Sequence, residues 1–180
     1  MAHDPRSSVT PDDLGLRDGE LRLVSHRSAW AESYKREAAR LRPFLPPSAQ
    51  LEHISSTAVP GLIAKPVLDL AVRFEDVSGV VVAEVTLPGL NYRFRDDAGA
   101  NGGRIWLRDL NEKRTHILHL VAQGDSQRER WLALRDLLRQ SARAREQYAE
   151  AKAQAMLHAR DRQDYTRLKT ATIHRLLAGW

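Results

Sequence analysis

Two short apolar runs, residues 51–54 and 67–72, frame a compact loop and constrain the fold more than any other part of the chain. Both runs have the length of β-strands, and Pro60, Gly61 and Pro66 interrupt the interval between them. The pattern therefore predicts two strands joined by a tight connection that carries hydroxyls, a lysine and flanking acids.

The second run contains one carboxylate, Asp69. Strand alternation places Leu68, Leu70 and Val72 on one face and Asp69 on the opposite face. An ionised acid in such an apolar run needs a partner, because burying an unpaired charge is costly. A metal ion, a basic side chain and backbone donors all meet this need. Asp69 is therefore either a functional residue or half of a structural ion pair.

Three small hydroxyl residues, Ser55, Ser56 and Thr57, follow the first predicted strand. Their backbone N–H groups would be accessible to a phosphate, as at a helix N-terminus or an anion-binding nest. The alternative is a simple helix cap. The nearby Lys65 and Asp69 favour the phosphate interpretation, in which these hydroxyl residues and Lys65 bind substrate.

The same segment, LEHISSTAVPGLIAKPVLDLAV, resembles the signature of the GrpB family. The resemblance continues through Trp30, through RTHILHLV at residues 114–121 and through REQYAEAK at residues 145–152, so it covers most of the chain. It implies an α+β fold of the nucleotidyltransferase type, distantly related to the polymerase β superfamily. This fold has a mixed β-sheet flanked by helices, and here a helical C-terminal third.

The superfamily pattern implied by this resemblance has Gly-Ser or Gly-Gly after a strand, followed by Asp-x-Asp or Asp-x-Glu on the next strand. Here Ser55 stands at the usual glycine, which restricts the conformations open to the turn. Ala71 stands at the second carboxylate, so the acid pair that holds magnesium is incomplete. Other ligands would have to compensate in a metal-dependent transfer.

A second strand pair is predicted from residues 103–110 and 115–121. His119 lies where nucleotidyltransferases often keep a third carboxylate, so Asp69, His119 and Glu52 are candidates to hold Mg²⁺ or Mn²⁺ and to act in catalysis. GrpB relatives usually have a histidine where this chain has Ile117. The alternative for His119 is a hydrogen-bonded core residue.

Three more residues are candidates to bind substrate. Arg104 lies on the first arm of this strand pair and suits phosphate recognition, the alternative being a solvated sheet face. Tyr165 and Lys169 lie one turn apart on the last predicted helix, and the same spacing recurs in GrpB-like sequences. An ordinary amphipathic helix end is the alternative for this pair.

Composition sets the outer limits. The 180 residues, 42% hydrophobic and 28% charged, suit one domain over residues 20–180 behind a flexible arm at residues 1–19. The absence of cysteine excludes disulfides and agrees with a cytoplasmic protein, and we expect no membrane insertion. A net charge of +5 favours anionic ligands, and the motifs of dedicated nucleic-acid readers are missing.

Three functions follow as hypotheses. The first is a nucleotidyltransferase-like enzyme that binds a nucleoside triphosphate with a divalent metal and transfers a nucleotidyl or phosphoryl group to a small acceptor. The second is a non-catalytic nucleotide- or metabolite-binding module, or an accessory folding module, which would tolerate Ala71. The third is an enzyme of specialised metabolism that uses the same pocket for different chemistry.

Overall fold

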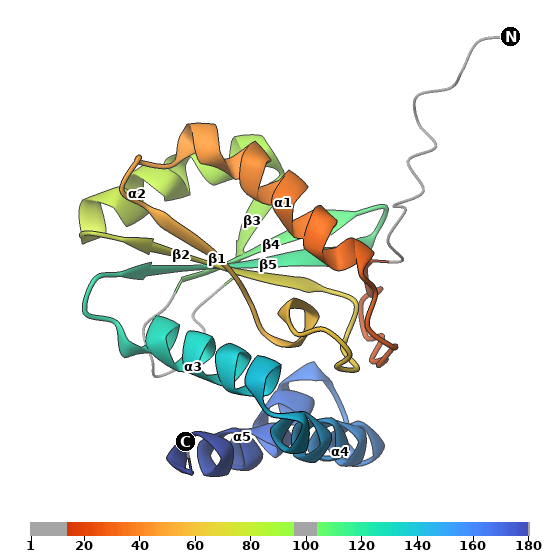
Figure 1. Cartoon of the computed structure of the whole chain (residues 1–180). Helices are drawn as coiled ribbons and strands as arrows, with labels where there is room; N and C mark the ends of the chain where they lie inside the picture. Colours follow the sequence, from red (N-terminus) through yellow and green to blue (C-terminus); the bar gives the residue numbers. More distant parts are fainter. Residues whose placement is uncertain (1–13, 96–103, 180) are drawn as a thin grey trace, which may run out of the picture.

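A computed structural model describes residues 14–95 and 104–179, and a five-stranded mixed sheet forms its centre (Figure 1). The strands are β1 (Gln50–Ile54), β2 (Leu68–Phe74), β3 (Tyr92–Arg95), β4 (Arg104–Leu110) and β5 (Lys113–Ala122). They lie in the order β1-β2-β5-β4-β3. Only β2 and β5 pair in parallel, and the other three pairs are antiparallel. The predicted mixed sheet is confirmed.

The strand register decides which side chains share a face. Asp69 lies opposite Ile117 on β5, and Ala71 lies opposite both His119 on β5 and Glu52 on β1. Because directly opposed residues project to the same side, Glu52, Asp69 and His119 share one face of the sheet. The main apolar row of β2 projects from the other face, as the alternation predicted.

Helices α1 (Ala29–Leu41) and α2 (Val77–Thr86) cover the face of the apolar row (Figure 1). The Asp76 carboxylate begins α2 by accepting a hydrogen bond from the backbone of Gly79. Between these helices and the sheet lies the main core. Its large side chains that are at most 2% exposed are Trp30, Leu41, Leu68, Leu70, Phe74, Leu87, Leu118 and Leu120.

The opposite face, which carries Asp69, is covered by α3 (Ser126–Gln140), α4 (Ala142–His158) and α5 (Arg162–Ala178) (Figure 1). Side chains at Asp125, Ser141 and Asp161 cap the three helices. A second apolar cluster joins α3 and α4 to the loop between β1 and β2 through Val59, Leu62, Leu134, Leu137, Leu138, Ala144 and Tyr148. This cluster packs the loop that carries Lys65 against α3 and α4.

The predicted flexible arm needs correction in its described part, residues 14–19. Leu14 and Leu16 are buried, and Leu16 exchanges backbone hydrogen bonds with Arg114 at the start of β5. Burial of these two apolar side chains holds the segment against the sheet. Residues 1–13, and the loop expected at 96–103, lie outside the described residues. Within the described part, no helix combines the length and apolar character that crossing a bilayer requires.

Candidate functional site

Asp69 and His119 form the centre of the candidate site. They project from adjacent parallel strands, and the His119 Nε2 atom lies 3.7 Å from an Asp69 carboxylate oxygen. Burial by itself would raise the pKa of Asp69, but the contact with His119 and the charges of Lys65 and Lys169 outweigh burial and lower it. Asp69 is therefore an ionised acid with 23% of its side chain exposed.

Lys65 and Lys169 lie on one buried aromatic ring. Their Nζ atoms are 4.9 Å and 5.4 Å from the centre of the Tyr165 ring, which is fully buried. The attraction of a cation to the face of an aromatic ring favours this arrangement. Burial lowers the pKa of Lys65 to about 8, the charge of Lys169 acts in the same direction, and Asp69 opposes both. The structure thus brings together four of the predicted site residues: Lys65, Asp69, Tyr165 and Lys169.

A third lysine, Lys152 on α4, is not among the predicted site residues, and it is only 1% exposed. Its amine donates a hydrogen bond to the Ile63 carbonyl and lies 5.4 Å from the centre of the Tyr148 ring. Burial, together with the charges of Lys169 and Lys65, lowers the pKa of Lys152 to about 6 against the opposing effect of Asp69. The signal available in the sequence was the family-like segment REQYAEAK, which ends at this residue.

The turn after β1 keeps a glycine-like backbone although its first residue is serine. Ser55 has φ 64° and ψ −166°, a region that essentially only glycine occupies without strain. Ser56 and Thr57 then enter the short 3₁₀ turn η2 (Ser56–Ala58), and both are buried. The Thr57 hydroxyl contacts the His53 Nε2 atom at 3.0 Å, so this hydroxyl serves the turn itself. The superfamily's preference for glycine here has a direct conformational cause.

Replacing Ser55 with glycine is expected to raise the free energy of unfolding by about 1 kcal/mol, because release of the strain exceeds the added chain entropy of glycine. Urea unfolding of the two proteins measures the difference. Ser28→Gly is a matched control, since Ser28 has an ordinary helical φ of −58° and makes no side-chain cap. A Ser55→Gly protein that is less stable than the parent would show that the turn is unstrained.

Glu52 faces the same side as Asp69, but its carboxylate is engaged elsewhere. Arg135 donates to one of its oxygens at 2.9 Å, and Arg128 contacts the other at 3.3 Å. Both arginines come from α3, which crosses this end of the sheet. The structure therefore does not bring the Glu52 carboxylate to the Asp69–His119 pair, because Arg128 and Arg135 bind it.

Arg104 is separated from the site by the sheet itself. It lies opposite Leu120, on the face covered by α1 and α2, and its guanidinium contacts the Glu84 carboxylate at 2.9 Å. The expectation that Arg104 meets the substrate needs this correction. Strand alternation predicts that Arg104 and Ile105 project to opposite faces of the sheet. The register with β5 decides which face carries Arg104.

The residues of the site do not by themselves form a metal centre. Across residues 14–95 and 104–179, no three His, Cys, Asp or Glu side chains gather closely enough to hold an ion. Ala71 stands between Glu52 and His119 in the register, and Glu52 is bound to arginines. Asp69 with His119 can thus provide part of a coordination shell, and the remaining ligands would have to come from a bound substrate.

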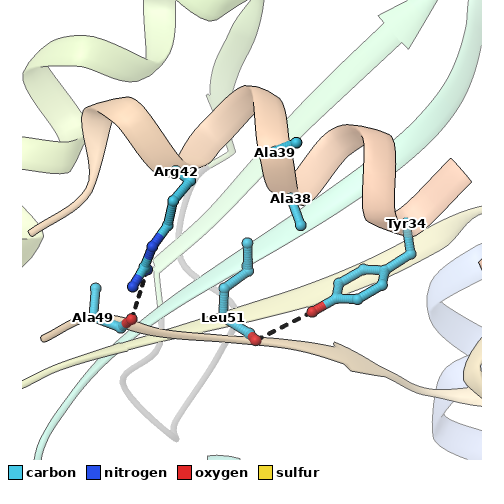
Figure 2. A pocket seen from close by; sticks show the side chains of 6 residues that line it. All are labelled: Tyr34, Ala38, Ala39, Arg42, Ala49 and Leu51. Carbon is cyan, nitrogen blue, oxygen red and sulfur yellow. Dashed lines mark hydrogen bonds between the residues drawn. The ribbon is translucent and has the colours of Figure 1, made fainter. Parts of the chain in front are cut away.

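A cavity of about 350 Å³ lies on the other side of the molecule, between α1 and β1 (Figure 2). It is lined by Tyr34, Ala38, Ala39, Arg42, Ala49 and Leu51. The Tyr34 hydroxyl donates to the Leu51 carbonyl and the Arg42 guanidinium donates to the Ala49 carbonyl, so both polar groups tie α1 to the strand (Figure 2). This cavity is separate from the Asp69 site.

The segment at residues 51–72 and the rest of the domain match a known protein family. The profile described as "GrpB protein" matches residues 20–178. The chain belongs to the GrpB family. Among relatives, the UPF0157 protein BH1888 of Halalkalibacterium halodurans is 30% identical over 176 residues, covering 94% of this chain and 87% of that protein. The UPF0157 protein YqkA of Bacillus subtilis is 30% identical over 136 residues, covering 75% of this chain, which spans 39% of that longer protein.

Solved structures agree with this membership. The conserved protein GrpB from Enterococcus faecalis is 28% identical with a TM-score of 0.75, covering 88% of this chain and 98% of that one. The Cid1 poly(U) polymerase with bound MgGTP has a TM-score of 0.50 at 13% identity, covering 73% of this chain and 44% of that one. The second likeness shows the fold alone. The predicted nucleotidyltransferase-like α+β fold of this GrpB protein is confirmed.

Proposed function

We propose that this GrpB protein binds a nucleoside triphosphate at Lys65, Lys152 and Lys169 beside Asp69. One observation carries the proposal: three lysines from a loop and two helices converge. Lys65 and Lys169 both lie over the Tyr165 ring, and their charges both lower the pKa of Lys152. Asp69 is the carboxylate that opposes these shifts for both Lys65 and Lys152. Converging cations that outnumber the acid beside them favour an anion with several charges.

The chemistry of the cluster suits phosphate groups. A lysine ammonium binds phosphate as a compact point charge with three donors, and a triphosphate carries enough charge to engage all three. Phosphate oxygens would also restore the protonated forms that burial disfavours at Lys65 and Lys152. The likeness of the fold to Cid1 with bound MgGTP supports a nucleotide as the source of the phosphates.

A divalent ion fits this site if it arrives with the phosphates. Mg²⁺ in nucleotide sites is commonly held by one or two carboxylates together with substrate phosphates, and Asp69 offers one carboxylate with His119 beside it. We therefore assign Asp69 and His119 as the residues that would hold Mg²⁺ or Mn²⁺. Such an ion would neutralise charge on the phosphates.

Transfer of a nucleotidyl or phosphoryl group to a small acceptor is the reaction class that this arrangement would support. The lysines would stabilise the negative charge that grows on the phosphate oxygens during transfer. Ala71 favours a second candidate, a nucleotide-binding module without catalysis. In the register Ala71 faces Glu52 and His119, and Glu52 is committed to Arg128 and Arg135.

Thermal unfolding with ATP, GTP, CTP or UTP, each with and without Mg²⁺ or Mn²⁺, tests the proposal. A nucleotide at about 100 times its dissociation constant should stabilise the protein by about 2.7 kcal/mol. Lys65→Met and Lys169→Met should abolish this shift, because each removes a converging cation. Asp69→Asn should keep the metal-free shift and lose the increment that the metal adds.

Arg104→Met is the matched control, since it also removes a cation but on the other face of the sheet. Its shift with nucleotide should equal that of the parent protein. The proposal is wrong if no nucleotide shifts the parent protein. It is equally wrong if the lysine variants respond as strongly as the parent does.

A further inference from the structure

Trp131 on α3 does not behave as a core residue of its helix. Leu134, Leu137 and Leu138 of the same stripe belong to the apolar cluster shared with α4, whereas Trp131 is part of neither described core cluster. Its indole is half-buried and contacts His119, with the two ring centres 4.7 Å apart and the planes inclined by 51°. A large aromatic side chain with one polar neighbour and partial exposure offers a surface to a ligand.

His119 connects this indole to the cationic part of the site. Its ring contacts Trp131, and its Nε2 atom lies 3.7 Å from the Asp69 carboxylate. Asp69 in turn acts on the pKa values of Lys65 and Lys152. The same face of the sheet therefore carries an aromatic surface and converging lysines, with His119 and Asp69 linking the two.

We propose that Trp131 packs against the base of the nucleotide while the lysines hold its phosphates. This inference rests on the proposed function and adds the recognition of the planar group. Bases of every kind have a π-face, and stacking on an aromatic side chain tolerates changes of sequence. The site therefore selects nucleotides over inorganic phosphates, with little preference among bases.

The test compares two ligands of similar charge, ATP and inorganic tripolyphosphate, by isothermal titration calorimetry. In the parent protein ATP should bind about tenfold or more tightly than tripolyphosphate, as expected for one stacked base. Trp131→Ala should weaken ATP binding by that factor and leave tripolyphosphate binding unchanged. Trp131→Phe keeps an aromatic face and should retain ATP affinity to within about threefold.

Fluorescence provides a second measurement that does not depend on the alanine variant. With Trp180 replaced by phenylalanine in both proteins, ATP should quench tryptophan emission when Trp131 is present and not in Trp131→Phe, while tripolyphosphate should quench neither, since Trp30 and Trp106 are buried. Far-ultraviolet circular dichroism and melting curves confirm that each variant is folded.

The possible outcomes separate this inference from the proposed function. If the parent protein binds tripolyphosphate as tightly as ATP, or if Trp131→Ala weakens both ligands equally, the anion site stands and stacking on Trp131 is wrong. The same holds if Trp131→Ala binds ATP unchanged. If the parent protein binds neither ligand, the proposed function fails and this inference fails with it.

Discussion

Replacing Lys152 with methionine is expected to stabilise the folded protein and to abolish nucleotide binding. Burial lowers the pKa of Lys152 from 10.5 in the unfolded chain to about 6. At pH 7 this shift costs the parent protein about 4–5 kcal/mol of stability. Losing the hydrogen bond to the Ile63 carbonyl removes about 1–3 kcal/mol of that gain, so the net increase is about 1–4 kcal/mol. Urea unfolding measures it.

The gain from Lys152→Met should depend on pH with a definite sign. A lysine with a lowered pKa makes the unfolded state bind more protons between pH 6 and 10.5, so the parent protein gains stability as the pH rises through this window. The advantage of the variant is therefore largest at pH 6 and below and shrinks as the pH rises. Near pH 10.5 only the lost hydrogen bond remains, and the parent is then the more stable protein. Nucleotide affinity of the parent should fall as the pH rises above 6, because the bound phosphates need a charged amine.

Lys35→Met is the matched control for Lys152→Met. Lys35 has 68% of its side chain exposed and pairs only with a neighbouring residue of its helix, Glu32. Its replacement should change stability by less than about 0.5 kcal/mol and leave nucleotide binding intact. If Lys152→Met destabilises the protein at pH 7, the cost assigned to burying this amine is wrong.

Replacing Glu37 with alanine should produce the largest loss of stability, about 3–5 kcal/mol, because it strands a buried arginine. Glu37 is 4% exposed on α1 and accepts from Arg40 at 2.5 Å, from Arg108 at 2.8 Å and from the Tyr92 hydroxyl at 2.8 Å. Arg108 has only 14% of its side chain exposed. Its charge on β4 would lose the carboxylate of α1 that compensates it. Urea or thermal unfolding of the variant measures the loss.

Glu32→Ala is the control for Glu37→Ala on the same helix, since its ion pair with Lys35 is exposed and screened by solvent, and its loss should change stability far less. The pH provides a further check. Burial raises the pKa of Glu37, but Arg40, His116 and Arg108 outweigh burial and lower it. The contribution of Glu37 is therefore present above the ordinary pKa of a glutamate and is lost as the pH falls through the lowered value. Equal losses from the two variants would contradict the role of the network.

Alternation and the family signature predicted the features that depend on neighbouring residues. The facing of Asp69 follows from its place between Leu68 and Leu70, and the position of His119 near Asp69 follows from the fold type. In each case a few adjacent side chains determine the geometry.

Other features depend on contacts between distant segments and were beyond sequence reasoning. Lys152 lies in an alanine-rich, charged segment whose pattern predicts a solvent-exposed helix. Its burial depends on the docking of α4 against the loop that carries Ile63. The ion-pair partner of Glu52, Arg135, lies more than eighty residues later in the chain. The face of Arg104 depends on the register between β4 and β5, which periodicity leaves undetermined.

The origin of the three lysines from a loop, α4 and α5 has a consequence during protein synthesis. All five strands precede α3, so a nascent chain can complete its sheet while the last two helices are still in the ribosome. Lys169 joins the site only after α5 has emerged and docked. On the proposed function, a ribosome-stalled chain lacking α5 would have its sheet but no affinity for triphosphate.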